Sequence, residues 1–355
     1  MQLSEIYDSQ AVALNRTEVE SNRIPYAGLA FFPTRKKMGI DLKWIKIHKG
    51  LGVSLRPSNF DAKPTIRSRQ GFKMEKTQMA FFRESMLVKE EDMIEIMRIQ
   101  EANDAYVSEV LNSIYDDTNA LVDGADIVAE RMRMQLLATD EGTPKIYLEA
   151  DNTIYEYNYD PDGSYKANHY LKLTGTATWD KPETAKPLTD LRTATQYLTG
   201  IGVSPRYALM TSATFDYLLD NKQVTNAILA QNSTANIFLD NAMMEDFFLR
   251  KTKLIPILYD KMFIKEDEVT QAKFYPDDKV TIIGEGQLGN TWYGTTPEER
   301  TLLGNPTVDV TVLDRGIAVA VKTEAGPPVL VTTSVSQIVL PSYEGMDSTF
   351  VIDVK

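Results

Sequence analysis

Apolar residues recur at three- and four-residue steps between about Asn103 and Thr139, which is the spacing of one helical face. Asn103 can cap the start of this helix, and Gly142 can mark its end. At 1.5 Å per residue, roughly 36 residues would span about 54 Å. Thr118 and Gly124 interrupt the apolar seam, so the pattern favours a single amphipathic helix lying across a sheet over a coiled coil. The seam positions expected to pack are Leu111, Ile114, Leu121, Val128 and Met132.

Before the helix, two β-prone segments flank a long polar stretch. Alternation over Ile40–Ile47 predicts one strand, and Gln78–Val88 predicts a second. Residues 49–76 between them are rich in Gly, Ser, Pro, Lys and Arg and have little to bury, which predicts a projecting loop. We call residues 49–76 the basic loop. Residues 1–40 are weakly periodic and are expected to form an extended arm.

After the helix, the pattern changes twice. Residues 145–175 predict a hairpin around the turn Asp160–Gly163. Residues 187–303 alternate between helical and strand patterns, which is typical of an α/β domain. Within it we expect helices at Thr189–Leu198, at Ser212–Leu219 with Ser212 as the cap, and at Asp240–Arg250, and strands at Tyr207–Met210, Leu254–Tyr259 and Val280–Ile283. Four further strands are expected from Val308 to the end.

Charge is unevenly distributed along the chain. The net charge is −12, but residues 31–75 contain eleven Lys or Arg against three acids, a net charge of +8, which leaves −20 for the other 310 residues. A basic segment on an acidic body suits nucleic acid or the acidic body of another copy, and a merely solvated basic face remains open. Lys63, Arg67 and Arg69, near the tip of the basic loop, are the candidate inter-subunit contacts.

Candidate chemistry in the sequence is sparse. The chain has no cysteine and only two histidines, His48 and His169, which excludes disulfides, thiolate nucleophiles and cysteine zinc sites. Gly284–Gly289 fits a dinucleotide-binding glycine pattern, but the β-prone residues after it favour a turn. Asp160–Gly163 resembles the start of a calcium loop, yet position 171 is Leu where the bidentate Glu would stand. The carboxylate pair Asp277-Asp278 is expected to lie on a solvated face. We therefore predict no catalytic residue, cofactor or metal.

Signals for membrane insertion or export are also missing. No segment approaches the roughly 18–20 apolar residues of a spanning helix. The first ten residues, MQLSEIYDSQ, lack the basic start and apolar run of a secretory signal. We expect a protein made in the host cytoplasm, with no membrane partner.

Several phrases of the sequence, in their order and spacing, resemble the lambda-type major capsid protein E family of tailed phages. Glu130–Thr139 followed by Gly142 resembles the end of that family's spine helix, and Thr178-Trp179-Asp180 with Pro187–Leu191 its entry into the axial domain. Tyr207–Phe215 and Val280–Gly284 resemble a later strand-to-helix step and a buried strand.

The resemblance implies an α+β fold of the Hong Kong 97 capsid type. Its parts would be an N-terminal arm at 1–40, an extended E-loop at 41–88, a peripheral domain at 89–178 and 306–355 with a spine helix at about 103–139, and an axial domain at 179–305.

The same resemblance implies a major capsid protein whose pentamers and hexamers form the icosahedral shell of a virion around double-stranded DNA. Its partners would be other copies of itself, a portal, a decoration protein in some relatives, and DNA held by non-specific contacts. Because the chain enters the E-loop by about residue 41, scaffolding is expected from a separate protein. An α/β enzyme or ligand-binding protein that uses residues 187–303 is the alternative. A nucleic-acid-binding module would rest on the basic segment alone.

Overall fold

The computed structural model describes residues 25–46, 73–88, 106–150, 153–229, 241–267, 269–299, 308–312, 316–324 and 330–355. They belong to two compact units, each built from three separate stretches of the chain. The first unit comprises 1–43, 76–132 and 290–342, and the second comprises 44–75, 133–289 and 343–355. We describe each unit by itself.

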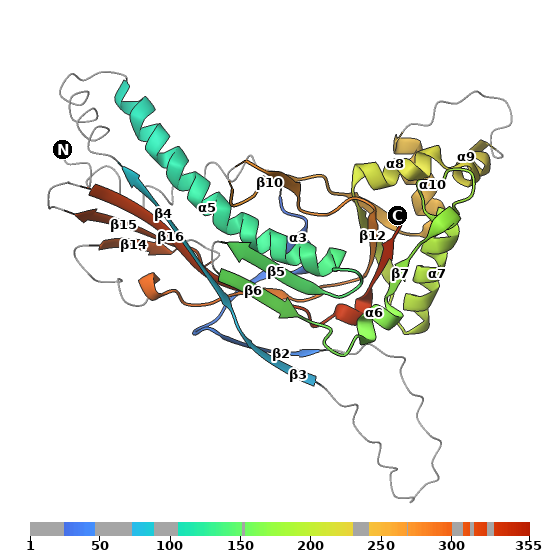
Figure 1. Ribbon diagram of the computed structural model, residues 1–355, viewed down its shortest axis with the longest axis horizontal. Helices are drawn as coiled ribbons and strands as arrows, with labels where there is room; N and C mark the ends of the chain where they lie inside the picture. The colour runs from blue at the N-terminus through green and yellow to red at the C-terminus, as the bar shows by residue number, and fades with distance from the viewer. Residues whose placement is uncertain are drawn as a thin grey trace, which may run out of the picture. The chain divides into compact units, whose positions relative to one another are not determined.

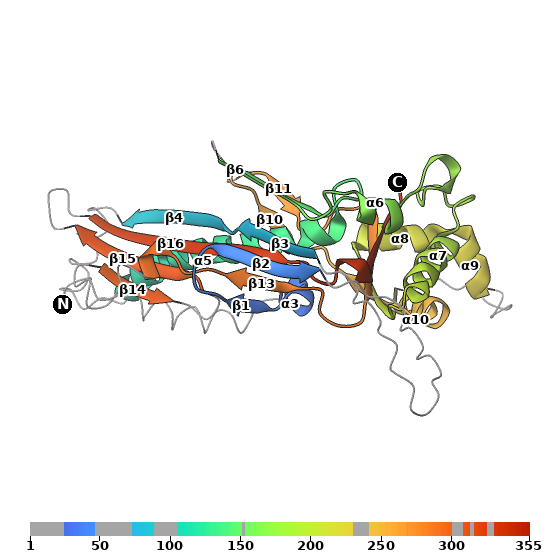
Figure 2. The same cartoon turned by 90° about the horizontal axis from the view of Figure 1, so that it is seen from below.

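A long-stranded sheet forms the first unit (Figure 2). Strand β16 is its centre, pairing with β15 and β13 in succession and with β4 along nine residues. The strands are β1 (Thr34–Lys36), β4 (Ala80–Val88), β13 (Asn290–Tyr293), β14 (Val308–Val312), β15 (Ala318–Glu324) and β16 (Leu330–Ser342). A short helix, α3 (Gly28–Phe31), precedes β1. Residues 25–40, predicted as part of an arm, therefore contain a helix and a sheet strand, because Phe31 and Phe32 are apolar enough to be buried.

The predicted long helix is present as α5 (Tyr106–Ala138), which belongs to the first unit up to Met132. The helix ends close to the glycine that the sequence pointed to, since Gly142 lies four residues after Ala138 and has φ +85°. A Cβ at Gly142 would approach the Tyr170 ring to 2.5 Å, so both backbone angle and space favour glycine there.

The second unit contains a five-stranded sheet in the order β7-β17-β12-β8-β9. Its strands are β7 (Tyr170–Lys172), β8 (Pro205–Met210), β9 (Ile255–Leu258), β12 (Lys279–Gly284) and β17 (Thr349–Asp353). The helices shown with it in Figure 1 are α6 (Ser164–Asn168), α7 (Pro187–Gly200), α8 (Ser212–Asp220), α9 (Lys222–Leu229) and α10 (Asn241–Thr252). Short 3-10 turns lie at Gly175–Ala177 and Met346–Ser348. The buried core includes Leu191, Leu198, Phe215, Phe248, Ile282 and Ile352.

Three two-stranded sheets are also present among the described residues. They pair β2 (Asp41–Lys46) with β3 (Lys73–Gln78), β5 (Lys145–Ala150) with β6 (Thr153–Asn158), and β10 (Met262–Ile264) with β11 (Gln271–Lys273). The strand that pairs with β2 is therefore β3, which the sequence assigned to the loop. Its residues KMEKTQ have no run of apolar side chains, so the apolar pattern missed it.

The predicted hairpin turn at Asp160–Gly163 is wrong. The hairpin is β5–β6, and Asp160 instead leads into α6, where its carboxylate accepts the backbone N–H groups of Tyr165 and Lys166, each at 3.0 Å. A buried Asp that satisfies the free N–H groups of a helix start is a strong local reason for that helix. The cap of α8 also differs from the prediction, since the side chain of Thr211, not Ser212, accepts the Thr214 N–H.

Two strands pair across the predicted boundaries of the axial domain. Strand β17, from the segment assigned to the peripheral domain, pairs with β12 over five residues in the sheet of the second unit. Strand β13, from the segment assigned to the axial domain, pairs with β16 in the first unit. The sequence of a short apolar strand does not determine which strand it pairs with. Only the pairing in the folded chain assigns such a strand to a sheet.

Candidate functional site

Strand β2, which leads into the basic loop, ends in a buried lysine, Lys46. Burial alternates along β2, with Leu42, Trp44 and Lys46 inside. Lys46 Nζ donates to the carbonyl oxygen of Tyr159 at 2.5 Å and lies 3.8 Å from Glu75 Oε1. The Trp44 ring lies 5.5 Å from that of Tyr159. Burying an ammonium requires such partners, so β2 is anchored on the second unit where the chain enters the loop.

Candidate residues at the loop tip, Lys63, Arg67 and Arg69, lie outside the described residues, as does His48. Pairing of β2 with β3 nonetheless brings Lys46, which precedes the loop, and Lys73, within the last four residues of the loop, onto neighbouring strands.

The long helix carries the predicted apolar seam together with buried polar groups. Leu121 and Met132 are buried and Val128 is half-buried, whereas the side chains of Leu111 and Ile114 are outside the described set. The helix also buries Asn119, Asp126, Glu130 and Arg133. An apolar periodicity cannot reveal these residues.

One hydrogen bond explains part of this polar burial, and a second joins the backbone of the helix to the sheet. Glu130 Oε1 accepts the Gly28 N–H at 2.9 Å, and the Ala125 carbonyl accepts Gln337 Nε2 at 2.8 Å. The carboxylate thereby ties α3 to α5, and the carbonyl ties β16 to the same helix. These contacts position elements of the first unit.

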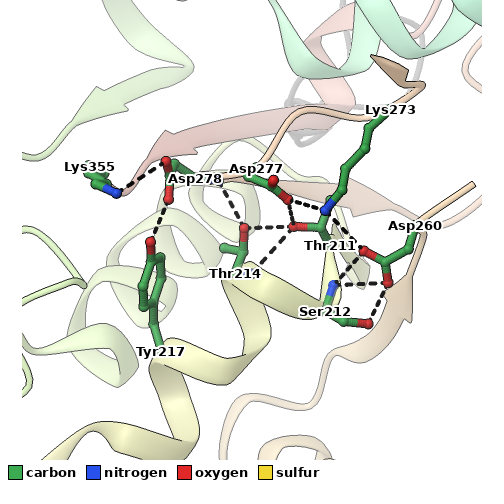
Figure 3. Close-up of polar contacts among 9 residues, drawn as sticks. All are labelled: Thr211, Ser212, Thr214, Tyr217, Asp260, Lys273, Asp277, Asp278 and Lys355. Carbon is green, nitrogen blue, oxygen red and sulfur yellow. Dashed lines mark hydrogen bonds and ion pairs between the residues drawn. The ribbon is translucent and has the colours of Figure 1, made fainter. Parts of the chain in front are cut away.

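A network of carboxylates and hydroxyls surrounds the start of α8 (Figure 3). Thr211 Oγ1 donates to Asp277 Oδ1 at 2.6 Å, and the Asp278 N–H donates to Thr214 Oγ1 at 3.0 Å. The Ser212 N–H donates to both carboxylate oxygens of Asp260, each at 3.1 Å. Carboxylates near the exposed N–H groups of a helix start are stabilising.

Lysines complete the network on two sides. Lys273 Nζ lies 2.8 Å from Asp277 and 3.6 Å from Asp260. Burial alone would raise the pKa of Asp277, but hydrogen bonds from Lys273 and Thr211 outweigh burial and lower the pKa. The hydrogen bond to Asp277 raises the pKa of Lys273.

On the other side of the network, Tyr217 Oη donates to Asp278 Oδ1 at 2.8 Å, and Lys355 Nζ lies 3.8 Å from Asp278 Oδ2 (Figure 3). The pair Asp277-Asp278, predicted to be simply solvated, thus fastens α8 to strand β12 and to the end of the chain.

The remaining chemical candidates occupy structural positions. His169 is buried, and its Nδ1 donates to the Thr349 carbonyl at 2.9 Å while its ring stacks on Tyr165 at 5.0 Å. Burial lowers the pKa of His169, which keeps the ring neutral. After Gly284–Gly289 the chain enters strand β13, whereas a dinucleotide site needs a helix there. Within the described ranges, no three His, Asp or Glu side chains gather closely enough to bind a metal.

Comparison with known proteins identifies the family of this chain. The family described as phage major capsid protein E matches residues 14–327. The chain belongs to this family. No curated protein matches the chain.

Solved structures similar to this capsid protein have the same mixed α+β fold. One, assigned as the capsid protein of a prophage of E. coli CFT073, is 12% identical and aligns over 98% of this chain and 99% of its own with a TM-score of 0.60. A phage-related protein from Bordetella bronchiseptica RB50 is 14% identical over 96% of each chain with a TM-score of 0.55. The capsid of cyanophage A-1(L) is 10% identical over 93% of this chain and 92% of its own with a TM-score of 0.50.

Family membership confirms the predicted capsid fold and the predicted role. The chain is a shell-forming capsid protein and a component of the virion, and it self-assembles. It is a structural protein, so the alternative of an α/β enzyme on residues 187–303 is not favoured. Among the helices that the structure describes, none has the length and apolar character needed to cross a membrane.

Proposed function

We propose that this capsid protein forms pentamers and hexamers that tile an icosahedral shell around double-stranded DNA, and that the basic loop of each copy clamps a neighbour. Assembly takes place in the host cytoplasm with a separate scaffolding protein and a portal, and DNA is held by non-specific contacts. A decoration protein can be added in such shells.

The charge distribution is the observation that supports the clamp. The segment 31–75 carries +8 and the rest of the chain −20, and the loop leaves from strands anchored through the buried Lys46. In a shell of identical copies, each basic loop can lie on the acidic body of the next. Exposed ion pairs contribute little singly, typically below about 1 kcal/mol, but repeated around a closed ring they act together.

Deleting the loop tests the clamp. Replacing residues 52–70 by a short Gly-Ser turn should leave a folded protein by circular dichroism but remove shells from negative-stain micrographs. Reversing Lys63, Arg67 and Arg69 to Glu should weaken assembly. If the loop instead serves DNA alone, both variants should form normal empty shells and fail only in packaging. Normal shells from the deletion would therefore contradict the clamp.

We also propose that the protein binds no nucleotide and catalyses no reaction. A ligand that binds only the folded state must raise the melting temperature by mass action. Excess adenine or nicotinamide nucleotide should leave the melting temperature unchanged. A clear rise would restore the nucleotide interpretation of Gly284–Gly289.

A further inference from the structure

Helices α7, α9 and α10 of the second unit border a cavity of about 310 Å³ (Figure 1). We call this cavity the α7 groove. Its described lining has two basic side chains, two amides, three threonines and a single apolar residue, Leu188. No acidic residue is among the described residues that line it. The groove is therefore suited to a small anionic group.

The two basic side chains of the α7 groove, Arg192 and Lys251, are not neutralised by the described part of the chain. Both are exposed, and neither forms an ion pair with a described residue. Lys251 Nζ lies 5.8 Å from the centre of the Phe247 ring, a contact that leaves its charge in place. Arg192 lies on α7 and Lys251 on α10, so two elements bring positive charge to one cavity.

The acids closest to these two residues in the sequence are engaged elsewhere. On α7, Asp190 Oδ2 accepts the indole N–H of Trp179 at 3.0 Å. On α10, Asp246 forms an ion pair with Arg250, one turn further along the same helix. Neither carboxylate is in the lining of the α7 groove, so the groove keeps its positive charge.

Side chains of the α7 groove can also donate hydrogen bonds to an anion. Thr195 and Thr252 already donate their hydroxyl protons to carbonyls of their own helices, at 2.6 and 2.7 Å. The amides of Gln196 and Gln223 form no side-chain hydrogen bond with a described residue. These amides and the two basic groups are therefore the available donors. Guanidinium, ammonium and amide groups are the donors that proteins use to contact DNA phosphates.

The composition of the lining favours a DNA phosphate over a protein partner. Protein interfaces are centred on aromatic or apolar anchors, and Leu188 is the single apolar residue described here. Phosphate contacts need only positive charge and donors, and they read no sequence. One such contact is weak, but many act together when a long ligand meets many copies. DNA provides this repetition, and a free nucleotide does not.

We infer that the α7 groove holds a backbone phosphate of the packaged DNA. The inference rests on the proposed enclosure of double-stranded DNA and names a surface that the DNA touches, separate from the basic loop. The net charge of the chain is −12, which by itself would repel DNA. A basic groove repeated in every copy would supply attraction at defined points of the shell.

The salt dependence of DNA binding tests the inference. A short fluorescent duplex is titrated with the purified protein, and binding is followed by fluorescence anisotropy at several salt concentrations. Arg192→Gln with Lys251→Gln should weaken binding about tenfold at about 0.1 M salt. The slope of log affinity against log salt should fall by about 1, because one phosphate contact is lost.

The matched control removes the same charge from another part of the second unit. Lys166→Gln with Lys265→Gln changes two exposed lysines outside the groove and should bind DNA like the natural protein. Equal affinity and slope for the groove variant and the control would overturn the inference. A groove variant that binds DNA normally but no longer forms shells would also overturn it, because the groove would then contact protein.

Photo-cross-linking in DNA-filled particles gives an independent test, because the chain has no cysteine. Gln196→Cys, carrying a photoreactive group on the thiol, should become linked to DNA on illumination. Lys166→Cys, an exposed position outside the groove, is the control. Linkage at the groove no greater than at the control would overturn the inference and leave the enclosure of DNA intact. Particles of the natural protein that contain no DNA would instead contradict the proposed function itself.

Discussion

At the scale of single residues, the apolar pattern of the long helix α5 predicts which apolar side chains are buried but not which polar ones are. Leu121 is buried as its place on the apolar seam suggests, but Glu130 is completely buried as well. Glu130 is stable there because its carboxylate accepts the Gly28 N–H. A buried carboxylate without such a partner would strongly destabilise the fold.

Leu121→Asp tests this distinction. The new carboxylate would be buried on the apolar seam, so we expect a loss of about 3 kcal/mol or more in the free energy of unfolding, measured by denaturant titration. The control is the neighbouring exposed residue, Ala120→Asp, which should cost less than about 1 kcal/mol. Equal melting temperatures for the two variants would show that this part of α5 is not packed.

At the scale of elements, the sheet of the second unit is completed by a strand from far along the chain. Strand β17 lies between β7 and β12 and is almost wholly buried. It is followed by Val354, whose carbonyl oxygen accepts the backbone N–H of Trp179 at 2.8 Å.

A fragment spanning 179–305 should therefore fail to fold cooperatively, although the α/β pattern of its sequence is continuous. Without β17, strand β12 loses a pairing partner along five residues and its apolar core stays open. A synthetic peptide of residues 343–355 should restore a cooperative melt, and the midpoint of that melt should rise with peptide concentration. A scrambled peptide is the control, and a cooperative melt of the fragment alone would contradict the expectation.

The network at the start of α8 makes a pH-dependent contribution to stability. The folded pKa of Asp277 lies below its unfolded value, so this contribution is present above the unfolded pKa, about 3.9, and is lost as the pH falls through the folded pKa. Asp277→Asn should lower the melting temperature at about pH 6, and the difference from the natural protein should shrink below about pH 4. Both carboxyl and lysine are partly exposed, so the effect should be small. If the difference in melting temperature did not change with pH, the charge on Asp277 would make no contribution to stability.

At the scale of the whole molecule, the dominant feature is the opposition between the basic segment and the acidic remainder. Exposed charges interact over about 10 Å at 0.1 M salt and about 3 Å at 1 M. If loops hold neighbours by charge, the yield of shells should fall as salt rises across this range, as measured by light scattering or sedimentation. The variant reversed at Lys63, Arg67 and Arg69 should show its largest defect at low salt and a weaker dependence on salt.

The sequence by itself determined the local features of this capsid protein. The period of apolar residues located α5 to within three residues at its start, and the charge count located the basic loop. The order of its phrases was enough to identify the family. These features depend on residues that are close together along the chain, so they can be read from the sequence alone.

Only the tertiary structure decided which strands share a sheet and which polar groups can be buried. Strand β3 was hidden because its residues are polar. The sequence did not show which sheets β13 and β17 join, because a short apolar strand does not specify its partner. Glu130, Lys46 and the carboxylates around α8 likewise depend on partners distant in the chain. The exposed side of the β5–β6 hairpin has the same origin, because cross-strand register places Tyr147, Glu149, Ile154 and Glu156 on one side.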